Sequence, residues 1–173
     1  MSSSAAPALS VHALFAERDE KRRREREADE LLRQKQQEEL AAFRKRLDEF
    51  ELTDERIAAF AGRVTSAFER GETELMISSF PSSFCTDNGR AVNNADVPPI
   101  NRGKAEEAGA PREPEWLATL PRGVRVVYEY WEKNLKPNGF GFSARVINFP
   151  GGMPGDIGLF VSWPKSLADM EHK

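Results

Sequence analysis

A stretch of about 40 residues without glycine or proline constrains this chain more than any other feature. It runs from Val11 to Glu51 and consists mainly of Ala, Leu, Glu, Gln, Lys and Arg, which are strong helix formers. Because glycine and proline are the residues that most readily interrupt a helix, we predict one helical arm over residues 11–52. At 1.5 Å per residue the arm would be about 60 Å long.

The first half of the arm is almost entirely charged. Between Glu17 and Glu30 six basic and seven acidic residues alternate, and many stand three or four positions apart, where opposite charges pair on a helix. The basic run Lys21–Arg24 suggests nucleic-acid binding, but the acids cancel the positive field that phosphate binding requires. We therefore prefer a solvated helix and keep nucleic-acid binding as a third alternative.

The second half of the arm carries a short apolar stripe formed by Leu40, Phe43, Leu47 and Phe50. Their 3,4,3 spacing places them on one side of a helix, as in a coiled-coil seam or a helix docked on a neighbour. Earlier positions of the same register are polar, so the stripe is too short for a long coiled coil. We predict that these four residues contact a protein partner or a second copy of the chain.

A second helix is predicted from Asp54 to Arg70. Thr53 is suited to the N-cap, the acids at the start favour a helix N-terminus, and Gly71 stands where a left-handed cap is expected. Its apolar residues recur at steps of three and four, so one face should pack on the rest of the protein.

Three later segments are predicted to be strands, namely Thr73–Phe80, Phe140–Phe149 and Ile157–Trp163. The last two are joined by a glycine- and proline-rich connection and should form an antiparallel hairpin. Helices are predicted over Glu115–Leu120 and from Val124 to Leu135. The fold class is therefore α+β: a long N-terminal helical arm and a second helix, followed by a small three-stranded antiparallel sheet with one or two covering helices.

This pattern divides the chain into four parts. Residues 1–10 form a flexible leader, 11–52 the charged arm, 53–164 a compact α+β domain and 165–173 a flexible tail. The domain contains a turn-rich loop over 81–114, which is longer than usual connections and is either functional or disordered.

Composition excludes several classes of protein. A net charge of −3 is neither a polybasic nor a strongly acidic balance, and no apolar run reaches the roughly 18 residues of a membrane span. The small polar N-terminus lacks the features of a signal peptide, so we expect a cytoplasmic protein. The single cysteine, Cys85, excludes an internal disulfide and a multi-cysteine metal site. We predict no cofactor and no metal.

A polar cluster in the long loop is the best candidate for a ligand site. It comprises Asp87, Asn88, Arg90, Asn93 and Asn94, joined by Asp156 before the last strand. Arg90 could bind a carboxylate or phosphate, and the amides offer donors and acceptors. The competing and preferred interpretation is that these residues form turns and cap their own backbone.

Two further residues, Cys85 and Met153, are candidates for a functional role. Cys85 has no histidine nearby and an acidic neighbour that would raise its pKa, so we interpret it as structural and assign no catalytic residue. Met153 stands between glycine- and proline-containing turns at the predicted hairpin tip, where a contact with another protein and a purely structural turn are equally favoured.

These observations give three hypotheses. We favour a non-enzymatic interaction or regulatory module that binds a protein partner, or itself, through the N-terminal helix and the small domain. The second hypothesis is a small-ligand-binding protein or enzyme that uses the Asp87–Asn94 loop and Asp156. It requires these loops to converge on a pocket. The third is nucleic-acid binding by the arginine-rich part of the arm.

Overall fold

The computed structural model describes residues 9–95 and 113–170. The chain divides into two compact units, Met1–Phe43 and Arg44–Lys173. Helix α1, Val11–Asp48, forms the first unit and continues into the second. The predicted arm, residues 11–52, is thus one helix that ends four residues before the predicted C-terminal bound.

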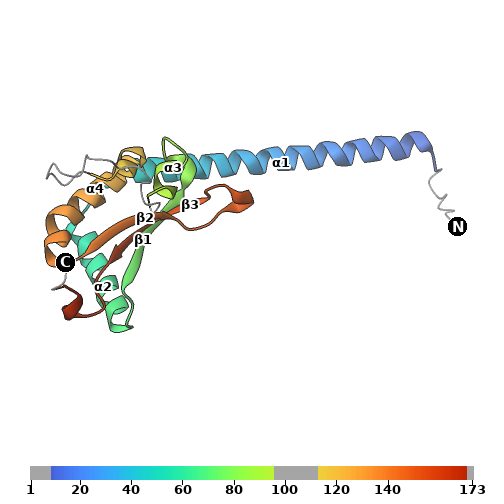
Figure 1. Cartoon of the computed structure of the whole chain (residues 1–173). Coiled ribbons are helices and arrows are strands. Elements are labelled where there is room, and N and C mark those ends of the chain that lie inside the picture. The colour runs from blue at the N-terminus through green and yellow to red at the C-terminus, as the bar shows by residue number, and fades with distance from the viewer. Residues whose placement is uncertain (1–8, 96–112, 171–173) are drawn as a thin grey trace. The chain divides into compact units, whose positions relative to one another are not determined.

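Helix α2, Asp54–Glu69, is set by local signals in its sequence (Figure 1). The Thr53 hydroxyl accepts a hydrogen bond from the backbone N–H of Arg56 at 3.3 Å, as expected of an N-cap residue. After the last turn, Gly71 takes a left-handed conformation with φ of 80°, which a residue without a Cβ adopts readily. Both ends of the helix agree with the sequence-based prediction to within one residue.

The described part of the chain contains a three-stranded antiparallel sheet. Its strands are β1, Glu74–Pro81, β2, Gly141–Val146, and β3, Asp156–Ser162. Strand β3 lies between the other two and pairs with both, so the predicted hairpin of the last two strands is confirmed (Figure 1). The α+β architecture with its three antiparallel strands is therefore as predicted.

One face of this sheet forms the floor of the hydrophobic core. Ile157, Leu159 and Val161 alternate along β3 and are at most 1% exposed. Of their neighbours across the strands, Phe80 and Ala144 are buried as well. The register of β1 shifts between Met76 and Ser78, and this bulge leaves Ile77 as the extra residue.

Helix α4, Arg122–Tyr130, packs on the core face through aromatic side chains. Phe142 of β2 lies 6.2 Å from the ring of Trp116, 5.7 Å from Tyr128 and 5.7 Å from Trp131. Such offset and edge-on pairs add stabilisation beyond the burial of their area. The Trp131 indole also donates to the carbonyl of Phe140 at 2.9 Å, so its polar group is satisfied in the interior.

The predicted helix from Val124 to Leu135 is present but changes its winding. After Tyr130 the chain makes one π-helical turn, Trp131–Leu135, and then a 3-10 turn, Lys136–Asn138. The side-chain amide of Asn134 donates to the Tyr130 carbonyl at 3.1 Å. Gly139 ends the helical stretch with φ of 88°, at the turn where the sequence predicted its end.

The remaining described segments are short helices. The predicted helix Glu115–Leu120 is a 3-10 helix, Glu115–Thr119, and the long loop contains a second one, Ser82–Phe84, followed by helix α3, Arg90–Asn93. Two more 3-10 helices are Pro150–Gly152 and Leu167–Met170. Most of the predicted leader (1–8), the centre of the predicted 81–114 loop (96–112) and the end of the tail (171–173) lie outside the described residues.

Candidate functional site

Helix α1 presents apolar side chains that its own chain does not enclose. None of its residues, all of which are described, is buried. The large apolar side chains exposed on it are Val11, Leu14, Phe15, Leu31, Leu32 and Leu40. Most helices in proteins are stabilised by burying one face. Helices α2 and α4 have buried residues, whereas the apolar side chains of α1 remain accessible to solvent.

The predicted stripe Leu40, Phe43, Leu47 and Phe50 crosses the division between the two units. Leu40 is 44% exposed and Phe43 is half-buried. Leu47 and Phe50 belong to the second unit, where they lie against Gly123 of α4. A Cβ on Gly123 would stand 1.8 Å from the Leu47 carbonyl oxygen. Two of the four predicted contact residues therefore already pack within their own domain.

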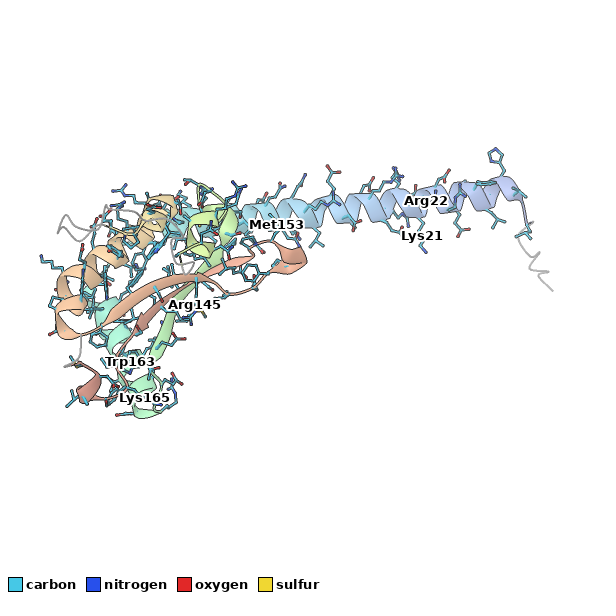
Figure 2. The ribbon with its side chains drawn as sticks, viewed as in Figure 1. Lys21, Arg22, Arg145, Met153, Trp163 and Lys165 are labelled. Atoms are coloured by element: carbon cyan, nitrogen blue, oxygen red, sulfur yellow. The ribbon has the colours of Figure 1, made fainter. Side chains whose placement is uncertain are left out.

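The charges of α1 pair along the helix. Glu20 accepts hydrogen bonds from Arg23 at 2.9 Å and from Arg24 at 3.0 Å, and the bond from Arg23 is the main cause that lowers the pKa of Glu20. Lys21 and Arg22 stand on the same stretch (Figure 2). These ion pairs locally neutralise part of the basic run that suggested nucleic-acid binding.

Asp87 caps the backbone of its own loop. One carboxylate oxygen accepts from the N–H of Gly89 at 3.0 Å and the other from the N–H of Ala91 at 2.7 Å. This is the turn-forming arrangement that the sequence analysis preferred for the cluster. Arg90, Asn93 and Asn94 are exposed on or beside α3.

The two predicted ligand loops do approach one another. The Ser82 N–H donates to the Gly155 carbonyl at 2.8 Å, and its hydroxyl donates to the Pro154 carbonyl at 2.7 Å. Asp156 is engaged by Asn148, whose side-chain amide donates to its carboxylate at 2.7 Å. All six predicted ligand residues are described, and none of them lines the apolar cavity that α2 and α4 form with the sheet. A ligand role for them stays a prediction.

Cys85 is buried and held in its thiol form. Burial is the main cause that raises its pKa, and the neighbouring carboxylate of Asp87 adds to the effect, so the pKa reaches about 11. A thiol with this pKa carries little thiolate near neutral pH. The environment therefore suits a structural residue better than a nucleophile.

The β2–β3 connection carries Met153 at a position 68% exposed (Figure 2). Gly151 and Gly152 before it have φ of 61° and 78°, values that favour glycine. Between Phe149 and Met153 the connection turns through the short 3-10 helix Pro150–Gly152. The predicted contact role of Met153 stays a prediction.

The second face of the sheet carries a polar bridge over an aromatic ring. The Arg145 guanidinium lies 3.6 Å above the Phe160 ring and bonds to the Glu74 carboxylate (Figure 2). This hydrogen bond is the main cause that lowers the pKa of Glu74. Phe160 in turn covers Gly158, where a Cβ would meet the ring at 2.7 Å. The arrangement shields the open face of the sheet.

The core face of the sheet is incompletely filled between α2 and α4. A cavity of about 310 Å³ lies there, within the second unit. Its floor includes Phe142, Leu159 and Val161, and its walls include Phe60 of α2 and Val127 of α4. Arg56, Ala59 and Arg63 of α2 also line it and are exposed, so the cavity opens to solvent along this helix.

The sequence does not reveal this cavity as a whole. Only the helical spacing of two of its lining residues can be recognised in the sequence. Arg56 and Arg63 are seven positions apart and therefore share a face of α2 with apolar residues of the same helix. The cavity itself follows from the packing of segments distant in sequence, which periodicity does not reveal.

No protein-family model matches this sequence, and neither a curated protein nor a solved structure matches it significantly. Across residues 9–95 and 113–170, no helix is long and apolar enough to cross a bilayer. In the same ranges no three His, Cys, Asp or Glu side chains are grouped as a metal site would need. The function has to be inferred from the chain's own residues.

Proposed function

We propose that this protein is a non-enzymatic interaction module, in which α1 recognises a helix of a partner or of a second copy of the chain. The observation that supports this most directly is a 38-residue helix with no buried residue and several exposed leucines. Burying an exposed apolar side chain of a helix in a groove of a partner stabilises the complex.

Leu32 and Leu40 are the best candidates for the contact in the first unit. They are eight residues apart, hence about 80° apart around the axis of α1 and within one broad face of the helix, and they are 56% and 44% exposed. Phe43, half-buried, continues the same side toward the second unit. Leu47 and Phe50 are less suited to an external contact because they pack against α4.

The ion pairs of α1 favour a helix that persists in solvent before any partner binds. Glu20 with Arg23 and Arg24, and Lys45 with Glu49, are spaced by three or four residues. Opposite charges at this spacing favour the helical conformation. A recognition helix that is formed in advance loses less conformational entropy on binding.

The test replaces Leu32 and Leu40 together by glutamate in the full chain. A matched control replaces Gln34 and Gln37, two exposed polar residues of α1, by glutamate and so adds the same charge. Sedimentation velocity over a range of protein concentrations measures self-association, and affinity capture with mass spectrometry measures partners. We expect the leucine variant to lose self-association or captured partners, and the glutamine variant to keep them.

The proposal fails if the wild-type chain is monomeric at every concentration and the leucine variant captures the same proteins as the wild type. Circular dichroism must show equal helix content in the two variants. That comparison separates a lost contact from a lost helix.

A further inference from the structure

The cavity between α2 and α4 is lined by apolar side chains on most sides and by charged side chains on the side of α2. The sheet and α4 contribute mainly aliphatic and aromatic side chains, whereas α2 contributes two arginines. Arg56, Phe60, Arg63 and Ala67 follow each other at steps of four, three and four, so they share one face of the helix. Ala67 is fully buried. The two guanidinium groups are thus carried on the inward face of α2.

Both arginines bond to backbone carbonyls. Arg63 donates to the carbonyl of Met76 at 2.8 Å. Arg56 donates to the carbonyl of Glu51, and its guanidinium lies 4.7 Å above the Phe50 ring. Among the described residues, no carboxylate oxygen lies within 4.0 Å of either guanidinium. Each group has five N–H donors, so donors remain for a ligand at the cavity mouth.

The electrostatic surroundings of the two arginines differ. Glu49, Glu51 and Glu55 line a surface groove together with Arg56, which reduces the positive potential there. Arg63 lines the cavity but not this acidic groove. It is therefore the better placed of the two to bind an anion.

We propose that this cavity binds a monocarboxylate with an unbranched aliphatic tail, the tail inside and the carboxylate on Arg63. Apolar walls, with the Arg63 guanidinium at the opening, match the two ends of such a molecule. An apolar cavity of about 150 Å³ holds one benzene molecule. The cavity here is 310 Å³, which suits a tail of about eight to ten carbons on that scale. The site does not include Leu32 and Leu40, the proposed contact residues of α1, because its lining residues belong to the second unit.

The first experiment is calorimetric titration of the full chain with hexanoate, octanoate and decanoate. Each methylene that enters the cavity should tighten the affinity about fourfold, and the gain should stop once the cavity is filled. In parallel, 1-decanol tests the head group. It should bind about tenfold more weakly than decanoate, because it lacks the charge-assisted hydrogen bonds to Arg63.

Two variants locate the ligand. Arg63→Gln should weaken decanoate binding about tenfold and leave decanol binding unchanged. The matched control is Arg70→Gln, which removes an arginine just after α2 that pairs with Glu72 and does not line the cavity. It should bind decanoate like the wild type. Val127→Phe should fill part of the cavity and reduce the affinity for both ligands.

Several outcomes would overturn the proposal. The first is the absence of binding heat with decanoate, and the second is equal affinity for hexanoate and decanoate. A third is unchanged decanoate affinity in Arg63→Gln, since that side chain is exposed and its loss should leave the fold intact. Unchanged affinity in a folded Val127→Phe variant would place the ligand elsewhere. Thermal unfolding of each variant verifies that it is folded.

Discussion

Helices α2 and α4 border the same cavity on the same face of the sheet, yet they are held in place by different means. Gly123, Val124 and Tyr128 of α4 are buried. In α2, whose residues are all described, Ala67 alone is buried. Apolar residues of α2 such as Phe60 are half-buried because they face the cavity. Tertiary packing therefore holds α4 much more firmly than α2.

The ends of the two helices show the same difference. Helix α2 begins with a side-chain cap from Thr53 and ends at a left-handed Gly71. Helix α4 begins after Pro121 with no side-chain cap of its own, and the Asp48 carboxylate accepts from its first N–H at 3.4 Å. Local sequence defines α2, whereas distant residues help define α4. A helix of the first kind depends less on its contacts with the sheet, which suits a wall of the proposed ligand site.

The largest expected difference between the two helices is in the free energy of unfolding lost when an aromatic side chain is removed. Tyr128→Ala should reduce the free energy of unfolding by about 3–5 kcal/mol, because it removes a buried ring in contact with three others. Phe60→Ala should reduce it by about 1–2 kcal/mol, because this ring is half-buried beside an existing cavity. Chemical denaturation followed by circular dichroism measures both. Equal losses would contradict the view that α2 is loosely packed.

Elements that are defined by nearby residues could be predicted from the sequence, whereas elements that depend on distant residues could not. The bounds of α2 could be predicted because its stripe and caps are all within 20 residues. The π turn at Trp131–Leu135 could not be predicted. In this region the Trp131 indole bonds to Phe140, and Asn134 bonds back to Tyr130, contacts that periodicity does not encode.

The candidate sites were less predictable than the fold. Exposure of Leu40 follows from its isolation among polar neighbours, but the packing of Leu47 and Phe50 depends on Gly123, more than 70 residues later. The acid at Asp87 was correctly suspected of capping its own turn. The cavity is lined by segments that lie far apart in the sequence, between Leu47 and Val161, and that meet only in the folded domain. The sequence places Arg63 on the apolar face of α2, but only the position of the sheet shows that this residue lines a cavity.

Replacing a glycine by alanine should change the stability in opposite directions in the two helices. Gly123→Ala should destabilise the protein by about 1–3 kcal/mol, because the new Cβ would stand 1.8 Å from the Leu47 carbonyl oxygen. Gly62→Ala in α2 should stabilise it by about 0.5–1 kcal/mol, because nothing lies within 4 Å of the added methyl and alanine favours the helix. Urea denaturation of both variants measures these changes. Stability unchanged in Gly123→Ala would mean that the end of α1 does not approach α4 as closely as described.

The smallest expected effects concern how each helix begins. Thr53→Ala should reduce the free energy of unfolding by about 1 kcal/mol, because the N–H of Arg56 loses its acceptor. Asp48→Ala should cost about 0.5 kcal/mol, because its bond to the Arg122 N–H is long and exposed, at 3.4 Å. Amide hydrogen exchange resolves the two helices separately. Thr53→Ala should speed exchange in the first turn of α2 and leave α4 unchanged, since a capping bond acts on its own helix end. Faster exchange in both helices would show that α2 and α4 unfold as one unit, and the contrast between a locally defined and a tertiary-defined helix would then be wrong.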